Sequence, residues 1–255
     1  MPSQELPPQP CRPLKHASDH DEYRIPRPID ACLFDVFITI LNWHSTVTCQ
    51  VARLSKGLIL EGSQNAVDFS EEWRAGYYTH VQVHPDSNVH TRDPHLTTSQ
   101  ILDNMLTTPR WSRFGESDRE DLTMIWHNLT DTIPDLEKLE CHVYILALSN
   151  GNLNLLLDLA KNQGVPWDGI FSSEMFVSCK PNKEVYESAA YHLSLPSHKI
   201  ATVAADNFDL LVAASVGFQT IYVPPREVRE GMRSKKDSGE VNLVVRFSRA
   251  GEADT

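Results

Sequence analysis

An aspartate stands directly after a short apolar run that is typical of a buried strand. The run covers residues 31–34, and Asp35 follows it. Open α/β sheets place their ligand sites at the carboxyl ends of strands, so this carboxylate is a candidate for chemistry. A second acid two residues later would add a ligand for Mg²⁺, but the chain has Phe37 there. We therefore expect no obligatory metal and no magnesium-dependent phosphoryl transfer.

Three more polar motifs follow later in the chain. They are Ser149-Asn150-Gly151-Asn152, Lys180-Pro181, and Ala204-Ala205-Asp206 with Asp209. Lys180 comes just before a predicted helix, where a cation is electrostatically unfavourable, and this indicates a functional role. Two simpler interpretations stay open: Ser149 caps the helix that follows it, and Asp209 is a first-turn acid favoured by the helix dipole.

The second half of the chain alternates between strand and helix patterns. Strands are predicted at 141–148, 169–172, 200–204 and 218–223, and helices at 152–162, 181–193 and about 207–216. Repeated βα units imply a mostly parallel sheet with right-handed crossovers. Pro181 is expected to open its helix, because proline suits the first helical turn. One further strand-like run covers residues 241–247.

The stretch between the first strand and these units is different. It has helical patterns at 46–56, 69–83, 98–105 and 116–129 and little strand signal. We interpret residues 46–136 as a helical cap inserted into a core of residues 28–45 and 137–255, because such a lobe can cover a pocket. Residues 1–27 are rich in proline and polar residues, which predicts a flexible leader.

Composition limits the classes of partner. The chain has 255 residues, 41% of them apolar, with 23 Lys and Arg against 34 Asp and Glu, a net charge of −11. This charge argues against nucleic acid or an anionic membrane as the main partner, and leaves small-molecule substrates open. No segment approaches a transmembrane helix, and no signal peptide is apparent, so a cytoplasmic location is expected.

The five cysteines form no CxxC motif and no metal-like spacing. We interpret them as reduced thiols. Cys32, Cys49 and Cys141 fall in apolar stretches and are predicted to be small core residues.

The four motifs, in this order and spacing, resemble those of the haloacid dehalogenase superfamily. More narrowly, the sequence is similar to the type II 2-haloacid dehalogenases of bacteria and fungi, with fungal-type divergence. Three further runs strengthen the narrower resemblance: Glu72-Trp73-Arg74, Gly164-Val165-Pro166-Trp167-Asp168 and Ser173-Glu174. The similarity covers roughly residues 28–230. It implies an α/β fold, a Rossmann-like parallel sheet core with an inserted helical cap, no cofactor, and a homodimer.

The resemblance also implies roles for individual residues. Asp35 matches the nucleophile that displaces halide and forms an aspartyl ester. Thr39 matches the hydroxyl that steadies the nucleophile loop. Arg74 matches the cap arginine that receives the leaving halide, and Ser149 and Asn150 match groups that hold the substrate carboxylate or the halide.

The remaining matches lie in the later motifs. Lys180 matches the lysine that holds the carboxylate of the nucleophile, and Tyr186 matches a tyrosine beyond that lysine, although a packing role for it stays open. Asp209 matches the carboxylate that orients Lys180 and the hydrolytic water. The pocket lining is expected to include Phe37, Ile38 and Phe208.

Three positions depart from the family pattern. Ile38 replaces a glycine; either the site has a positive φ and is strained, or the loop tolerates isoleucine and its side chain reshapes the pocket floor. Ala204 replaces a serine. Asp206 replaces an asparagine or histidine, and a second carboxylate beside Asp35 raises the cost of ionising both.

Three functions remain open on this basis. The first is a hydrolase with Asp35 as nucleophile on a 2-halo acid or a similar small electrophile. In the second, Asp35, Lys180, Asp206 and Asp209 carry out acid–base chemistry, such as epimerisation, isomerisation or elimination, on a larger secondary metabolite. The third is a non-catalytic binding protein. A small, closed pocket would favour the first function, and a wide cleft the second.

Overall fold

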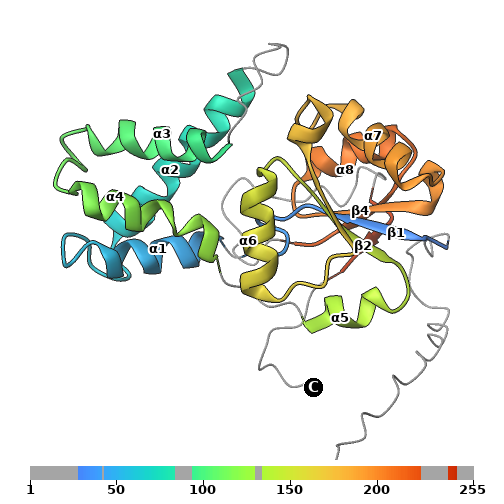
Figure 1. Cartoon of the computed structure of the whole chain (residues 1–255), viewed down its shortest axis with the longest axis horizontal. Helices are drawn as coiled ribbons and strands as arrows, with labels where there is room; N and C mark the ends of the chain where they lie inside the picture. Colours follow the sequence, from blue (N-terminus) through green and yellow to red (C-terminus); the bar gives the residue numbers. More distant parts are fainter. Residues whose placement is uncertain (1–27, 42, 84–93, 130–133, 225–240, 246–255) are drawn as a thin grey trace, which may run out of the picture.

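A computed structural model describes residues 28–41, 43–83, 94–129, 134–224 and 241–245. The predicted leader, residues 1–27, lies outside them. The centre is a six-stranded parallel sheet with strand order β3-β2-β1-β4-β5-β6 (Figure 1). The strands are β1 (Ala31–Phe34), β2 (Tyr144–Ser149), β3 (Gly169–Ser172), β4 (Ile200–Ala204), β5 (Gln219–Tyr222) and β6 (Leu243–Val244). The predicted parallel α/β sheet is confirmed.

Alternating side chains of the central strand β1 pack on opposite faces of the sheet. Ala31 and Leu33 join a cluster with α7 (Lys183–Leu193) and α8 (Asn207–Ser215). Cys32 and Phe34 point the other way, into a cluster with α5 (Pro134–Glu140). Figure 1 shows these helices on either side of the strands. Both faces are covered, which explains why β1 reads as a continuous apolar run.

Helices α1 (Trp43–Leu54), α2 (Gln64–Val83), α3 (Pro94–Leu106) and α4 (Glu116–Thr123) gather beside the sheet (Figure 1). Buried aromatic residues of this group, including Phe69, Trp73 and Trp111, share one apolar cluster with α6 (Leu153–Gln163). The single helix predicted at 116–129 is wrong, because α4 ends at Thr123 and a separate 3₁₀ turn, η1, covers Trp126–Asn128. The group lies within the stretch interpreted as a cap, and its role as a cap stays a prediction.

Capping side chains decide where two helices begin. Asn152 caps α6 by accepting a hydrogen bond from the Leu155 backbone N–H at 2.7 Å, so the alternative in which Ser149 caps this helix is wrong. Asn182 caps α7 by accepting from the Glu184 N–H at 3.0 Å. The prediction that Pro181 opens α7 is therefore also wrong, and Lys180 and Pro181 belong to the preceding loop.

The cysteine prediction holds at only one of its three positions. Cys32 is buried, and burial raises the pKa of its thiol to about 12. Cys49 and Cys141 are exposed, on the outer side of α1 and in the turn after α5, so their assignment to the core is wrong. Within the described residues, no helix is long and apolar enough to cross a membrane.

Ile38 has a backbone φ of 75°, in the left-handed region that favours glycine. Its side chain is partly buried and packs against the apolar cluster that α1, α2 and α6 share. The strained alternative for this loop is therefore confirmed. Packing of the isoleucine side chain compensates for the conformation of its backbone.

Comparing Ile38→Gly with Ile38→Ala isolates this strain, since both variants lose the same packing. We expect the glycine variant to be the more stable by about 1 kcal/mol, because only alanine keeps the Cβ clash at positive φ. Urea unfolding of both variants measures the difference. At a position with negative φ, a protein with alanine is more stable than the same protein with glycine. An Ile38→Ala variant that is more stable than Ile38→Gly would therefore contradict the prediction.

Candidate active site

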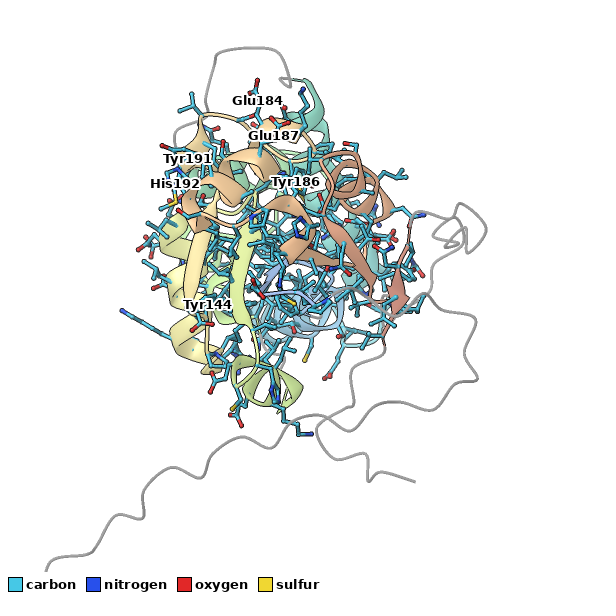
Figure 2. All side chains as sticks on the ribbon, turned by 90° about the vertical axis from the view of Figure 1, so that its right-hand side faces the viewer. Tyr144, Glu184, Tyr186, Glu187, Tyr191 and His192 are labelled. Atoms are coloured by element: carbon cyan, nitrogen blue, oxygen red, sulfur yellow. The ribbon has the colours of Figure 1, made fainter. Side chains whose placement is uncertain are left out.

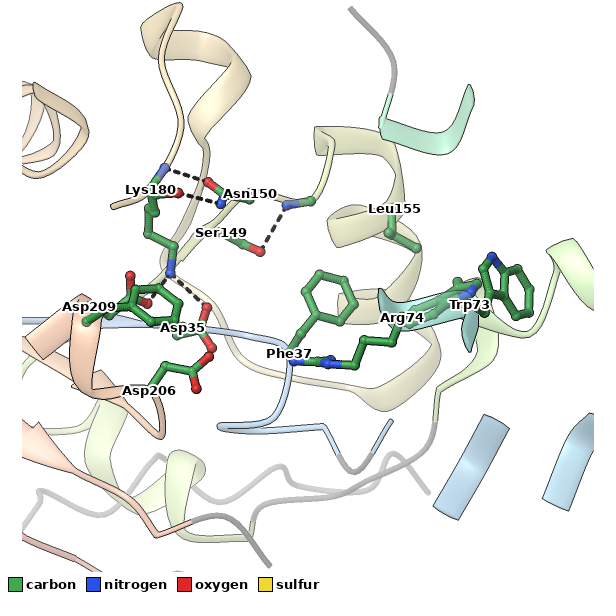
Figure 3. A pocket seen from close by; sticks show the side chains of 13 residues that line it. Asp35, Phe37, Trp73, Arg74, Ser149, Asn150, Leu155, Lys180, Asp206 and Asp209 are labelled. Atoms are coloured by element: carbon green, nitrogen blue, oxygen red, sulfur yellow. Dashed lines mark hydrogen bonds and ion pairs between the residues drawn. The ribbon is translucent and has the colours of Figure 1, made fainter. Parts of the chain in front are cut away.

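A small cavity opens at the carboxyl ends of β1, β2 and β4, beside α2 and η1 (Figure 3). Its volume is about 90 Å³. The lining residues are Asp35, Phe37, Trp73, Arg74, Trp126, Ser149, Asn150, Gly151, Leu155, Lys180, Asp206, Phe208 and Asp209. All three motifs that follow the first in the sequence therefore meet at this one place, as neighbouring parallel strands require.

Two side chains hold the carboxylate of Asp35. Lys180 Nζ donates to its Oδ1 at 2.7 Å, and Thr39 Oγ1 donates to its Oδ2 at 2.9 Å. The Thr39 hydroxyl oxygen in turn accepts from the Ala205 backbone N–H at 2.9 Å. Thr39 thus joins the loop after β1 to the loop after β4. Thr39 orients the Asp35 carboxylate through its hydrogen bond to Oδ2 and does not itself line the cavity.

Lys180 lies between two carboxylates. Its Nζ is 2.7 Å from Asp35 Oδ1 and 2.6 Å from Asp209 Oδ2, and its side chain is only 4% exposed. The Asn150 amide fixes the lysine backbone: Oδ1 accepts from the Lys180 N–H at 2.7 Å, and Nδ2 donates to the Lys180 carbonyl at 3.0 Å. Asn150 is predicted to hold substrate, and this role stays a prediction. Its two hydrogen bonds join its side chain to the backbone of Lys180.

Burial and charge act in opposite directions on this pair. Burial raises the pKa of Asp35, and the charge of Asp209 adds to the rise, whereas Lys180 lowers it. Burial alone would lower the pKa of Lys180, but the charges of Asp209 and Asp35 outweigh burial and raise it. Lys180 therefore stays protonated and supplies the positive charge that an ionised Asp35 needs at this depth.

Asp209 has both oxygens occupied. Oδ2 accepts from Lys180, and Oδ1 accepts from the Tyr186 hydroxyl at 2.6 Å. Tyr186 is fully buried inside the molecule, whereas Glu184, Glu187 and Tyr191 lie on the outer side of α7 (Figure 2). Burial first, and then the charge of Asp209, raise the pKa of Tyr186. Tyr186 therefore positions Asp209 and does not line the cavity.

Asp206 differs from the other two acids of the site. It occupies the N-cap position of α8, yet its side chain makes no capping bond. Its carboxylate lines the cavity beside that of Asp35 (Figure 3) and has no hydrogen-bond partner among the described residues. Burial, followed by the charges of Asp35 and Asp209, raises the pKa of Asp206 to about 6, against the opposing charges of Arg74 and Lys180.

Arg74 reaches the cavity from α2, across from the acids (Figure 3). Its guanidinium stacks over the Trp43 ring at 4.3 Å, and Trp43 lies parallel to Trp126 with ring centroids 6.2 Å apart. Trp126 Nε1 is buried and has no hydrogen-bond partner in the part of the chain that the structure describes. An aromatic wall of this kind lowers the local dielectric around a cation, which strengthens its attraction for an anion.

The hydrophobic part of the lining follows the expectation in part. Phe37 and Phe208 line the cavity, and Phe208 is 42% exposed at its edge. Ile38 does not line it, so the prediction that its side chain reshapes the pocket floor is wrong. The Phe37 ring packs closely on Gly151, where an added Cβ would lie 2.9 Å from the ring.

Four lining residues are not among the predicted site residues: Trp73, Trp126, Gly151 and Leu155. Trp73 and Gly151 stand next to predicted residues in their motifs, whereas Trp126 and Leu155 fall in predicted helices. The described residues contain no group of three or more His, Cys, Asp or Glu side chains arranged to hold a metal ion.

Known proteins resemble this chain in sequence and in structure. No family model matches it. The (S)-2-haloacid dehalogenase 4A of Burkholderia cepacia is 26% identical over 202 residues, which cover 76% of this chain and 82% of that protein. The L-2-haloacid dehalogenase PA0810 superposes with a TM-score of 0.74 at 26% identity, over 85% of this chain and 94% of the other.

A second solved structure agrees with the first. The defluorinating L-2-haloacid dehalogenase Rha0230 gives a TM-score of 0.73 at 26% identity and covers 86% of this chain and 95% of its own. In sequence and in structure, the chain is therefore similar to the type II dehalogenases of the haloacid dehalogenase superfamily.

Proposed function

We propose that the protein is a metal-independent hydrolase in which Asp35 displaces the halide of a 2-halo acid or a related small electrophile. The observation that carries this proposal is the carboxylate of Asp35, held at 2.7 Å by Lys180 and 2.9 Å by Thr39 at the wall of a cavity of about 90 Å³. The ammonium group of Lys180 balances the charges of Asp35 and Asp209. Arg74 lies across the cavity with a cationic group for the departing anion.

The first step is a displacement at carbon. One Asp35 oxygen forms a bond to C2 of the substrate as the carbon–halogen bond breaks, and the halide leaves with the bonding electrons. The product is an aspartyl ester, which divides one difficult displacement into two easier steps. Fixing the carboxylate by two hydrogen bonds restricts it to one geometry, and this lowers the entropic part of the barrier.

The second step is hydrolysis of the ester. Water attacks the carbonyl carbon of the Asp35 side chain, the ester bond breaks, and a 2-hydroxy acid leaves. The carboxylate of Asp35 is restored and one proton is released. Lys180 is well placed to stabilise the oxyanion that develops on Asp35, since its Nζ already donates to Oδ1 at 2.7 Å.

Cavity size supports a small substrate. Pockets that enclose drug-sized ligands have volumes of roughly 300–1,000 Å³. The cavity at Asp35 has about 90 Å³, which suits a molecule of a few heavy atoms. This volume favours a halo acid over a bulky metabolite.

Single-turnover hydrolysis in H₂¹⁸O tests the proposal. We expect the protein to release halide from 2-chloropropionate and to take up the label in the Asp35 carboxylate, because water attacks that carbonyl carbon. Mass spectrometry of the peptide that contains Asp35 locates the label. Halide release with the label only in lactate would indicate direct attack by water and would contradict the ester route.

One observation favours the second candidate, acid–base chemistry without an ester. Asp206 has a pKa raised to about 6, which suits a residue that exchanges protons near neutral pH. Under this alternative the C–H bond next to the substrate carbonyl exchanges with deuterium, no halide appears and no label enters the protein. Proton NMR of candidate substrates in D₂O separates the two candidates.

A further inference from the structure

The two acids of the last motif differ in how they are used. Asp209 accepts hydrogen bonds on both oxygens, from Lys180 at 2.6 Å and Tyr186 at 2.6 Å. Neither oxygen can accept a proton from water unless one of these hydrogen bonds breaks. Asp209 is also almost fully buried, with a side chain that is 2% exposed. These contacts suit Asp209 to holding Lys180.

Asp206 has the opposite properties. Its carboxylate makes no capping bond and has no hydrogen-bond partner among the described residues, although it lines the cavity and is partly buried. Figure 3 shows it next to the carboxylate of Asp35, on the same side of the cavity. Buried polar groups are normally hydrogen-bonded, so substrate or water is the expected partner of the Asp206 carboxylate.

We propose that Asp206 is the general base of the second half-reaction, which accepts a proton from the water that hydrolyses the Asp35 ester. This assignment rests on the proposed function, since it requires an ester at Asp35. It makes Asp209 a positioning residue for Lys180. Of these two acids, Asp206 is the partly exposed one and Asp209 is buried.

The proton balance of the step is complete within the site. As the water oxygen bonds to the carbonyl carbon of Asp35, one of its O–H bonds breaks and the proton moves to Asp206. The ester C–O bond then breaks, and its electron pair stays on the product oxygen, which takes the proton back from Asp206 and leaves as a hydroxyl. The second proton of the water passes to solvent as the carboxylate of Asp35 reforms.

The charges around Asp206 change during the reaction in a favourable direction. Asp206 faces Asp35 at the end of β1, Asp209 on α8, Arg74 on α2 and Lys180 in the loop before α7. In the free enzyme the negative charges of Asp35 and Asp209 raise the pKa of Asp206, in addition to burial. Esterification neutralises Asp35 and removes that repulsion, so Asp206 is ionised when the water attacks.

Asp206→Asn separates the two half-reactions. With 2-chloropropionate we expect a burst of about one halide per active site, followed by turnover slowed roughly 10²- to 10⁴-fold, because only ester hydrolysis needs the base. Intact-protein mass spectrometry then shows the accumulated ester. Asp121→Asn, which removes an exposed acid on α4, is the matched control and should show neither the slow phase nor the adduct.

A pH profile of the wild-type protein gives a second readout. The single-turnover rate of ester hydrolysis should fall only as pH is lowered below about 6, because the ester of Asp35 no longer repels Asp206, and the pKa of Asp206 is then lower than in the free enzyme. The same rate in Asp206→Asn should be slow and independent of pH in that range. Both measurements follow deesterification itself, so a folding defect in the variant would not reproduce them.

Two results would overturn the assignment. One is wild-type turnover by Asp206→Asn without an adduct, and the other is an ester that accumulates in Asp209→Asn while Asp206→Asn turns over freely. Failure of the proposed function has a different signature: no release of halide by the wild type or by either variant. The base assignment would fall with it.

Discussion

Asp35→Asn lowers the rate of halide release from 2-chloropropionate by roughly 10⁴- to 10⁶-fold, the range for loss of a nucleophile. The variant keeps the shape of the side chain and the hydrogen bond from Thr39, but its amide oxygen is neutral and too weak to displace halide. It also removes one of the two negative charges that hold Lys180. Ion chromatography of free halide, with enzyme in excess, measures the residual rate.

Stability of the same variant shows whether activity is lost for the expected reason. A buried carboxyl with a raised pKa is costly to ionise, so its replacement should leave the free energy of unfolding close to that of the wild type. Asp121→Asn serves again as the control that keeps full activity. An Asp35→Asn protein that still releases halide at the wild-type rate would exclude both the ester route and acid–base chemistry at Asp35.

Lys180→Met lowers the free energy of unfolding by about 3–5 kcal/mol at neutral pH, because it leaves two buried carboxylates without their shared cation. Methionine fills a similar volume, so the loss reports charge and hydrogen bonding more than packing. Activity is lost as well, since Lys180 lowers the pKa of Asp35, and its removal raises that pKa further and makes the ionised nucleophile harder to form. Urea unfolding measures the first effect and halide release the second.

The pH dependence of the Lys180→Met defect has a definite sign. Lys180 lowers the pKa of Asp35, so without the lysine the native pKa of Asp35 lies further above its unfolded value, and Asp35 destabilises the fold where it is ionised in the unfolded chain. The deficit should therefore shrink as pH falls toward the ordinary pKa of aspartate and grow as pH rises. The double variant Lys180→Met with Asp209→Asn carries one unpaired carboxylate fewer than Lys180→Met. It should therefore recover part of the lost free energy of unfolding.

Lys183→Met is the matched control for this prediction. Lys183 begins α7 only three residues later, and its side chain is exposed. Its loss should change the free energy of unfolding by less than about 1 kcal/mol. Equal defects in both lysine variants would show that the Lys180 ion pairs contribute little to the stability of the fold.

Several features of the site could be predicted from sequence because of the order of elements. Asp35 and Asp206 each follow a strand and Ser149 ends one, and parallel neighbours place such positions at one edge of the sheet. The strand pattern alone therefore brings their motifs together. Lys180 was singled out because a cation before a helix is electrostatically unfavourable, and its two carboxylate partners explain its presence.

Other features depend on which way a side chain points, and sequence patterns do not determine that. Substrate binding by Asn150 stays a prediction, and in the structure its amide also holds the Lys180 backbone. The sequence left a packing role open for Tyr186, and in the structure its hydroxyl donates to Asp209. Residues on short loops and helix faces take directions set by packing across the whole site, which involves residues more than a hundred positions apart.

The sequence by itself determined the parallel sheet, the strand-end position of Asp35 and the replacement of a magnesium ligand by Phe37, because these follow from local apolar runs and residue type. Only the tertiary structure decided that Ile38 has a φ of 75° and that Lys180 binds Asp209, while Asp206 has no hydrogen-bond partner among the described residues. The two acids are three residues apart, at the N-cap and in the first turn of α8. The partners of Asp209, Lys180 and Tyr186, come from other parts of the chain, and only the folded structure brings them to this acid.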